Sequence, residues 1–262
     1  PYDQRHGKTG RLYGIFEGTA VAKMKALILN SGIGKRMGAL VKDRPKCMTP
    51  LLGGETIISR QLRQLAALGI GEAVITTGPF EGLLQSHCRE QKLPLKLDFV
   101  HNPEYERTNY IYSIYQARSL LDNEIVLMHG DLVFSDSVLA AALSGASDCM
   151  TVSSTAPLPQ KDFKAVVQGG RILKVGVEFF DSVLTAQPLY RLSRDSWRRW
   201  LENIVVFCES GRRTCYAEAA LNEILPELEL KPLDVKDDLC CEIDDERDLI
   251  LIRSKMADLP KE

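Results

Sequence analysis

The stretch KALILNSGIGKRMGALVKDRPKCM (residues 25–48) opens with an apolar run and continues into a segment rich in glycine and basic residues. The apolar run is typical of a buried strand. In a sheet of parallel strands, ligands bind beyond the carboxyl ends of the strands, so the loop after the first strand is a natural phosphate site. We expect Gly32 and Gly34 to take positive φ angles and to let backbone N–H groups approach phosphate oxygens. Lys35 and Arg36 add positive charge at the same point.

Three phosphate-binding motifs compete for this loop. A P-loop requires G-x-x-x-x-G-K-[ST], which the loop lacks, and a dinucleotide fingerprint requires G-x-G-x-x-G. The third glycine is Gly38, one position late, and the next predicted strand ends without a ribose-binding acid, so a hydride-transferring oxidoreductase is disfavoured. What remains is G-x-G-K-R-M followed by R-P-K, in which Arg36 and Lys46 converge on one polyphosphate and Pro45 stiffens the approach. The alternative is a tight turn with solvated basic residues, which the complete block of strand, loop and Pro-Lys disfavours.

Short apolar runs alternate with amphipathic ones along the first 150 residues. Predicted strands lie at 25–31, 72–78, 95–102 and 124–131, and predicted helices at 55–69, 81–91, 109–121 and 135–145, the last capped by Ser135. This alternation predicts an α/β fold with a Rossmann-like, doubly wound, mixed but mainly parallel sheet and helices on both faces.

The alternation breaks after residue 150. Predicted strands follow at 148–155, 164–170, 171–180 and 239–244, and predicted helices at 192–209, 214–228 and 245–257. Gly169 and Gly170 favour a hairpin turn between two of these strands. We interpret residues 24–262 as one domain in which residues 150–225 form a small α+β subdomain, a lid, at the edge of the core.

Composition excludes several classes of function. The chain has 262 residues, 45% of them hydrophobic, and a formal net charge of −2, so neither nucleic acid nor a membrane surface is an expected partner. No secretory signal peptide or run of about 20 apolar residues is present. Seven scattered cysteines without a C-x-x-C pair indicate reduced thiols of a cytoplasmic protein and disfavour a zinc site. We interpret residues 1–23 as an extension before a native start at Met24, or as the end of a segment fused upstream. In the second case, the fused partner could be another enzyme domain.

Four blocks of the chain resemble one enzyme superfamily. LILNSGIGKRMGALVKDRPKCMTPL is similar to the signature loop of the sugar-phosphate nucleotidyltransferases. HNPEYERTNYIYSIYQA, LMHGDLVF and CEIDDERDL resemble segments of the cytidylyltransferases that activate phosphocholine or 2-aminoethylphosphonate with CTP. The resemblance covers nearly all of residues 24–250 and is weak in the region that would bind the acceptor. Asn30 and Ser31 depart mildly from the family, in which a small residue usually precedes the first glycine.

The resemblance implies that Asp131 and Asp244 together hold a metal ion, which we expect to be Mg²⁺ because that ion prefers carboxylate and phosphate oxygens. Asp131 ends a predicted strand and could instead be an ordinary turn residue. Asp244 competes with Asp245 and Glu242, since these acids could simply cap the last helix. His129 is better explained as a packed core residue than as a ligand.

In this fold the base of the nucleotide is usually recognised by the loop after the second strand and by residues that open the helix after the third. The corresponding nucleotide-binding candidates are Thr77, Gly78, Thr108, Asn109 and Ser113. The alternative for this helix is a core-facing aromatic stripe. CTP itself is implied by the resemblance.

The acceptor is expected to carry a phosphate or phosphonate and an amine. Lys161, Lys164 and Arg107 are the cations that could bind its anionic group. Tyr216 and Glu218 lie where the phosphocholine enzymes have an aromatic and an acidic residue, although Glu218 could equally face plain solvent. In the segment DSWRRW, Trp197 and Trp200 have basic neighbours. A quaternary ammonium usually requires a fuller aromatic cage, so this segment favours an acceptor with a primary amine.

These features together predict a magnesium-dependent cytidylyltransferase. It would transfer CMP from CTP to 2-aminoethylphosphonate or phosphocholine and release pyrophosphate, with Lys46 and Arg36 as the catalytic cations. A sugar-1-phosphate nucleotidyltransferase is the nearer alternative. A non-catalytic nucleotide-binding regulatory protein is the other, and it would predict loss of Lys46 or of a metal carboxylate.

Overall fold

The structure is a computed structural model that describes residues 24–34, 37–38, 41–145 and 147–259. The predictions made for residues 1–23 and for Lys35 and Arg36 lie outside the described residues. The strands are β1 (Met24–Asn30), β2 (Glu72–Thr77), β3 (Lys96–His101), β4 (Glu124–His129), β5 (Leu132–Phe134), β6 (Cys149–Ser153), β7 (Lys164–Gln168), β8 (Arg171–Gly176), β9 (Val183–Leu192), β10 (Lys231–Asp234) and β11 (Cys240–Glu242). The α-helices are α1 (Ile57–Ala67), α2 (Glu81–Glu90), α3 (Tyr110–Ala117), α4 (Asp136–Ser144), α5 (Arg194–Glu209), α6 (Ala217–Ile224) and α7 (Glu246–Ala257).

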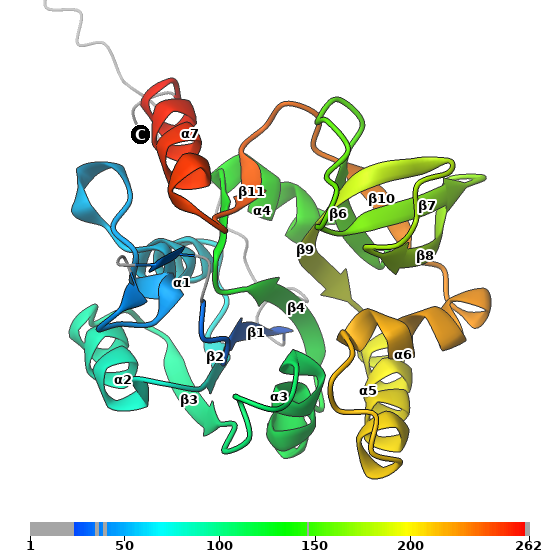
Figure 1. Cartoon of the computed structure of the whole chain (residues 1–262), viewed down its shortest axis with the longest axis horizontal. Helices are drawn as coiled ribbons and strands as arrows, with labels where there is room; N and C mark the ends of the chain where they lie inside the picture. Colours follow the sequence, from blue (N-terminus) through cyan, green and yellow to red (C-terminus); the bar gives the residue numbers. More distant parts are fainter. Residues whose placement is uncertain (1–23, 35–36, 39–40, 146, 260–262) are drawn as a thin grey trace, which may run out of the picture.

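The main sheet has the strand order β10-β6-β9-β4-β1-β2-β3 (Figure 1). Four of the six neighbouring pairs along this order are parallel, and the two antiparallel pairs are both made by β9. The β7–β8 hairpin pairs with β9 beside this path, while β5 and β11 form a separate antiparallel pair. The predicted mixed, mainly parallel sheet is therefore confirmed.

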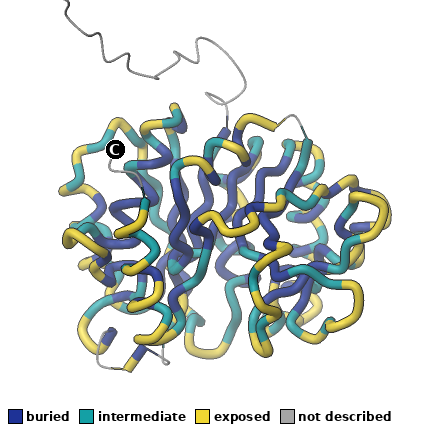
Figure 2. The backbone as a smooth tube through the Cα atoms, turned by 90° about the horizontal axis from the view of Figure 1, so that it is seen from above, coloured by how far each residue is buried: buried dark blue, intermediate teal, exposed yellow. Residues whose placement is uncertain are grey.

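Helices cover both faces of the sheet, as the alternation of strands and helices predicts. Leu27 and Leu29 of β1 belong to one core with residues of α3, α5 and α6, whereas Ala26 and Ile28 belong to a second core with residues of α1, α2 and α4. Because both faces are covered, β1 is apolar along almost its whole length rather than alternating with polar residues. Figure 2 shows the buried strands running through the middle of the molecule and the exposed segments around its margin.

The strand β9 was missed by the sequence analysis, although it lies in the middle of the sheet. It contains Pro188, which cannot donate a ladder hydrogen bond and argues against a central strand. The structure accommodates this proline because the pairing of β6 with β9 is irregular there: Met150 pairs with Tyr190, and Val152 with Ala186. The proline lies in the stretch where the register shifts.

Residues 150–225, expected to form a lid, contribute both to the sheet and to its flank. The segment contains most of β6, all of β9 and the β7–β8 hairpin, which belong to one nine-stranded sheet, and it contains α5 and α6, which lie beside that sheet (Figure 1). The predicted hairpin turn is confirmed, since Gly169 and Gly170 have φ angles of 59° and 73° between β7 and β8. The second strand of this hairpin ends at Gly176, earlier than the predicted residue 180.

The helix α4 begins directly after Ser135, as predicted, but the side chain of Ser135 does not cap it. Within the described residues, this hydroxyl forms a hydrogen bond of 2.8 Å with the hydroxyl of Ser137 rather than accepting one from the helix backbone. The predicted position of the helix start is thus right and the predicted capping contact is wrong.

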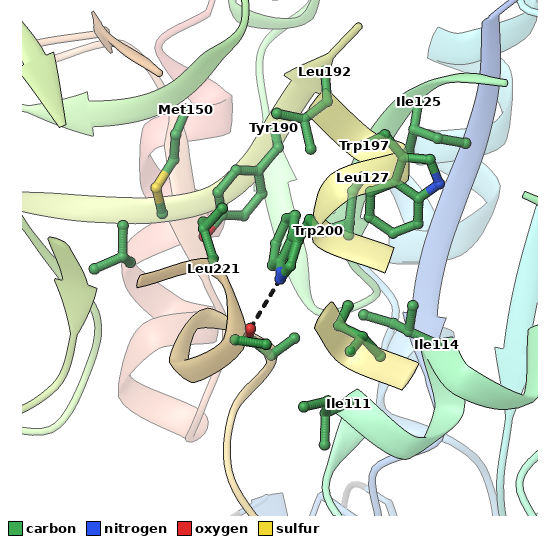
Figure 3. Close-up of a cluster of buried hydrophobic side chains, with 14 of the residues drawn as sticks. Ile111, Ile114, Ile125, Leu127, Met150, Tyr190, Leu192, Trp197, Trp200 and Leu221 are labelled. Atoms are coloured by element: carbon green, nitrogen blue, oxygen red, sulfur yellow. Dashed lines mark hydrogen bonds between the residues drawn. The ribbon is translucent and has the colours of Figure 1, made fainter. Parts of the chain in front are cut away.

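The two tryptophans of α5 belong to the core and not to a surface. Trp197 and Trp200 are each 1% exposed and pack with Tyr190, Leu127 and their neighbours (Figure 3). Each indole N–H donates to a backbone carbonyl, at 2.8 Å for Trp197 and 3.0 Å for Trp200. They attach α5 to the sheet and to α6, so they are unable to form a cage around a ligand.

Candidate active site

The loop that follows β1 places a glycine beneath a lysine side chain. Gly34 has a φ of 69°, and a Cβ atom built there would lie 3.3 Å from Cβ of Lys46. Gly32 does not take a positive φ, whereas Gly34 and Gly38 do, and the carbonyl of Gly34 accepts from the N–H of Met37. The prediction of positive φ is confirmed for Gly34 and wrong for Gly32. Among the described residues, no heavy atom lies within 4 Å of a Cβ built at Gly32, which leaves room for a ligand.

Lys46 lies between two carboxylates that are far apart in the sequence. It opens a short 3₁₀ helix, η3 (Lys46–Met48), directly after Pro45. Its Nζ atom donates to Oδ2 of Asp131 at 2.6 Å and to Oδ1 of Asp244 at 2.8 Å. Asp131 follows the carboxyl end of β4, and Asp244 follows β11. The structure therefore brings the predicted cation and the two predicted metal ligands together in one place.

The neighbouring acids, Asp245 and Glu242, make other contacts. Asp245 is the N-cap of α7, and its side chain accepts from the backbone N–H groups of Arg247 and Asp248. Glu242 accepts from, or shares a proton with, Nδ1 of His129 at 2.9 Å. The helix-capping alternative thus applies to Asp245, and Asp244 is the acid of this segment that contacts Lys46.

The electrostatics of this group follow from burial and charge pairing. Burial opposes the charged form of Lys46, but attraction to Asp131 and Asp244 outweighs it and raises the lysine pKa. Burial likewise opposes the ionised form of Asp131, and the Lys46 ammonium outweighs it, so the pKa of Asp131 is lowered. Burial, and then repulsion by Asp131, raise the pKa of Glu242 to about 7. Lys46 and Asp131 are therefore charged near neutral pH.

Two connected hollows lie around Asp131. The first, of about 270 Å³, is lined by Leu29, Asn30, Gly32, Gly34, Lys46, Cys47, Asp131 and Asp244. The second, of about 160 Å³, is lined by Leu29, Ser31, Gly32, Asn102, Tyr105, Thr108, Asn109, Tyr110, His129 and Asp131. Because Leu29, Gly32 and Asp131 line both, the hollows form one cleft at the carboxyl ends of β1 and β4. We call the first the phosphate pocket and the second the base-side pocket.

The donor set of the phosphate pocket fits a magnesium ion. The carboxylates of Asp131 and Asp244 come from different parts of the chain, and both contact the ammonium nitrogen of Lys46. Both contribute oxygen, the ligand that Mg²⁺ prefers, and open space remains for phosphate oxygens. His129, Asp131 and Glu242 also offer ligand atoms within 4.8 Å of one another, but there Nδ1 of His129 already bonds Glu242.

A buried polar network lies behind the base-side pocket. The side-chain amide of Asn102 donates to Oγ1 of Thr108 at 3.1 Å and to Oγ of Ser113 at 2.9 Å. Ser113 in turn shares a 2.5 Å hydrogen bond with Ser31 of the glycine loop. Asn109 is the N-cap of α3 and accepts from the N–H of Tyr110. Thr108 and Asn109 thus line the pocket, while Ser113 supports it from behind, and Asn102 is a residue that the sequence analysis missed.

Thr77 and Gly78 act on the glycine loop from outside the cleft. Thr77 is fully buried, and its hydroxyl lies 3.4 Å from Nδ1 of His101. A Cβ atom built at Gly78 would lie only 2.3 Å from the carbonyl oxygen of Ser31, so a glycine is required for the close approach of the two loops. Neither residue lines either pocket.

One of the predicted acceptor residues, Glu218, is a buried carboxylate. Glu218 is 1% exposed and accepts hydrogen bonds from the hydroxyls of Tyr110 and Tyr190, the latter at 2.8 Å. The alternative that it faces solvent is therefore wrong. Burial, and then the charge of Glu218, hold the pKa of Tyr110 well above its usual range, so this phenol stays protonated. Tyr216 is 41% exposed, and its ring centroid lies 5.8 Å from that of Tyr110 and 5.0 Å from that of Phe163.

The predicted acceptor cations differ in what they contact. Lys164 is fully buried and donates to the carbonyls of Pro159 and Asp162 at 2.8 and 3.1 Å, so it holds this loop instead of facing a ligand. Lys161 and Arg107 are exposed. The structure does not bring these three residues together, and Lys164 is ruled out as a direct acceptor ligand by its buried contacts.

His129 and Tyr110 are further residues of the cleft that the sequence analysis did not assign to it. Both line the base-side pocket, and their rings meet edge to face with centroids 4.8 Å apart. The prediction that His129 is merely a packed core residue misses its bond to Glu242 beside Asp131. The only local signal was its position two residues before Asp131 at the end of a strand.

Comparison with known proteins shows the family to which the chain belongs. Residues 26–229 match the MobA-like NTP transferase domain. The chain belongs to this NTP transferase family.

Two relatives of this NTP transferase chain carry names that include a phosphonate. It is 32% identical over 135 residues to CMP-5'-(3-aminopropyl)phosphonate synthase of Streptomyces rubellomurinus, a match that covers 52% of this chain and 21% of the relative. It is also 32% identical over 124 residues to 2-aminoethylphosphonate cytidylyltransferase of Lancefieldella rimae, covering 46% of this chain and 48% of the relative. The aligned part of the chain thus spans less than half of either relative.

A solved structure with the same fold covers nearly the whole chain. The CTP:phosphocholine cytidylyltransferase of Streptococcus pneumoniae superimposes with a TM-score of 0.69 and 17% identity, over 89% of this chain and 99% of that one. At this identity the likeness concerns the fold alone. Among the described residues, no helix is long and apolar enough to cross a membrane.

Proposed function

We propose that this protein is a magnesium-dependent cytidylyltransferase that joins CMP from CTP to a small phosphonate or phosphate carrying an amine. 2-Aminoethylphosphonate is the favoured acceptor, with phosphocholine second, and pyrophosphate is released. The observation that carries the proposal is the contact of Lys46 with both Asp131 and Asp244 beside the glycine loop. Membership of the NTP transferase family and the two phosphonate-related proteins support the reaction class.

The chemistry needs little covalent participation by the protein. An oxygen of the acceptor attacks the α-phosphorus of CTP, a new P–O bond forms, and the bond to the departing pyrophosphate breaks in line with it. The main obstacle is repulsion among negative groups. Lys46 contributes a positive charge in a pocket where burial strengthens its effect, and the backbone around Gly32 and Gly34 leaves room for phosphate oxygens.

A magnesium ion held by Asp131 and Asp244 would supply further neutralisation of phosphate charge. Binding of the triphosphate and orientation of the base are then left to residues of the protein. Lys46 binds and stabilises the triphosphate, and the polar edge formed by Thr108 and Asn109 orients the base in the base-side pocket. No general base is required, because the acceptor oxygen is already an anion.

A group of aromatic rings beside the cleft supports an acceptor that carries an amine. The rings of Tyr110, Tyr216 and Phe163 lie close together, and the buried charge of Glu218 lies behind Tyr110. Aromatic faces and a nearby carboxylate attract an ammonium group, whereas a sugar would need several polar partners. This combination supports an amine-bearing acceptor over a sugar phosphate.

The test is a matrix of nucleotides and acceptors with the purified protein and Mg²⁺. CTP, UTP, GTP and ATP would each be combined with 2-aminoethylphosphonate, phosphocholine and glucose 1-phosphate, and pyrophosphate and product mass would be measured. We expect release with CTP and an amine-bearing acceptor. Release only with glucose 1-phosphate, or no release in any combination, would reject the proposal.

A further inference from the structure

A buried glutamine of α1 holds the backbone on both sides of Asp131. Gln61 is 1% exposed, and its side-chain nitrogen donates to the carbonyl of His129 at 2.9 Å and to the carbonyl of Leu132 at 2.8 Å. Those carbonyls flank the dipeptide Gly130–Asp131. One amide group therefore uses both of its N–H donors to fix the ends of the turn that carries the metal carboxylate.

These carbonyls need a partner because pairing on the β9 side of β4 stops before them, although Leu29 of β1 still pairs with His129 on the other side. The pairing of β4 with β9 ends at Met128, one residue before His129. Leu132 begins the short strand β5, which pairs with β11 on one side only. A buried carbonyl without a partner costs free energy, so the donors of Gln61 replace the missing ladder.

Two further backbone groups of the turn are held by other elements. The N–H of Gly130 donates to the carbonyl of Leu29 at 3.0 Å, and the carbonyl of Asp131 accepts from the N–H of Ile243 at 3.0 Å. A Cβ atom at Gly130 would collide with the side chain of Asn30, so this turn lies directly on the glycine-loop strand. The side of the turn that faces α1 is held by Gln61.

We propose that Gln61 is a positioning residue for the metal site: it sets the orientation of Asp131 and thereby the affinity for the divalent cation and its nucleotide. This inference rests on the proposed function, because it presupposes that Asp131 is a metal ligand. Residues that orient a metal ligand commonly change metal affinity by about 10- to 100-fold when they are replaced. Gln61 lines neither the phosphate pocket nor the base-side pocket, so it would act through Asp131.

The chain supplies a matched control one helical turn away. Gln64 is also 1% exposed, and its side-chain nitrogen donates to the carbonyl of Phe134 at 3.0 Å and to Oδ1 of Asp136 at 2.6 Å. It supports β5 in the same way but from the far end, away from Asp131. Replacing either glutamine with methionine removes buried donors of the same kind and keeps the side-chain length.

The experiment measures Mn²⁺ binding by electron paramagnetic resonance in the presence of CTP and without acceptor, together with the melting temperature. We expect Gln61→Met and Gln64→Met to lower the melting temperature similarly, while Gln61→Met weakens Mn²⁺ binding about tenfold and Gln64→Met less than about twofold. Should Gln61→Met fail to fold, Gln61→Glu offers at most one donor to the two carbonyls and is expected to weaken binding in the same direction.

The outcomes distinguish a failure of the positioning role of Gln61 from the absence of the metal site. Unchanged Mn²⁺ affinity in Gln61→Met, or equal weakening in Gln61→Met and Gln64→Met, would overturn the positioning role and leave the proposed function intact. Absence of Mn²⁺ binding to the wild-type protein would remove the proposed metal site itself, and this inference with it.

Discussion

The two ends of the cleft handle negative charge in opposite ways. In the phosphate pocket, Asp131 and Asp244 contact the ammonium of Lys46, and the side chains of all three retain between 13% and 22% exposure. At the proposed acceptor side, Glu218 is 1% exposed and is covered by two neutral tyrosine hydroxyls. The first group is open enough to exchange its partner for a ligand, whereas the second is closed and can act on a ligand only through its field and through the rings around it.

This difference predicts which substitutions have large effects on activity and which have small ones. A charge that contacts the reacting phosphates changes the transition state, while a charge enclosed behind phenol groups changes only the binding of one end of a substrate. The phosphate pocket should therefore control turnover, and the acceptor side should control the KM for the acceptor.

The largest effect is expected for Lys46→Met. Loss of the cation should reduce kcat by about 10²- to 10³-fold, because a buried group that stabilises developing charge is removed. Steady-state pyrophosphate release measures this effect. Arg44→Ala is the control, since it removes an exposed cation of the same segment that pairs only with the adjacent Asp43 in the described structure. Equal losses in both variants would show that general positive charge, and not the position of Lys46, matters.

Asp131→Asn should rank second. The amide is a weaker ligand for a hard divalent cation, so the Mg²⁺ concentration for half-maximal activity should rise by about tenfold or more. A magnesium titration of the initial rate checks this expectation. Asp245→Asn is the matched control, because asparagine also caps a helix and Asp245 serves α7. A normal magnesium titration for Asp131→Asn would contradict the assignment of this carboxylate.

Gly34→Ala should have an intermediate effect. Alanine at a φ of 69° is strained by roughly 1–2 kcal/mol, and its Cβ would press on the Lys46 side chain at 3.3 Å. We expect the KM for CTP to rise about tenfold, which corresponds to about 1.4 kcal/mol. Gly53→Ala is the control, because Gly53 has a φ of 81° and, among the described residues, no heavy atom within 4 Å of its Cβ position. If both variants lose stability but neither changes the KM for CTP, the loop does not bind the triphosphate.

The smallest effect is expected for Glu218→Gln. Glu218 acts on the acceptor ammonium only from behind Tyr110, so loss of its charge should raise the KM for the amine-bearing acceptor roughly fivefold, which corresponds to about 1 kcal/mol, and leave the KM for CTP unchanged. Glu223→Gln on the exposed face of the same helix is the control, as its carboxylate pairs with Arg212 at the surface. A rise in the KM for CTP instead would place Glu218 at the nucleotide and break the distinction between the two ends of the cleft.

Local patterns predicted much of this site. The glycine loop, Pro45 and Lys46 occupy one continuous segment, so their spacing alone indicated a phosphate site. The position of Asp131 at the end of a predicted parallel strand placed it at the ligand-binding edge of the sheet, and the family resemblance implied its role at the metal. The errors arose where a residue's role depends on a partner far along the chain: Glu218 on Tyr110 and Tyr190, and Lys164 on the loop before it.

The sequence by itself determined the alternation of strands and helices, the turn at Gly34, and which lysine follows the rigid proline. These depend on periodicity and on backbone restrictions that each residue carries with it. The tertiary structure alone decided that β9 enters the centre of the sheet despite Pro188, that Asp244 rather than Asp245 reaches Lys46, and that Gln61 holds the turn of Asp131. The physical reason is that a side chain's burial and its hydrogen-bond partners are set by elements that meet only after the chain has folded.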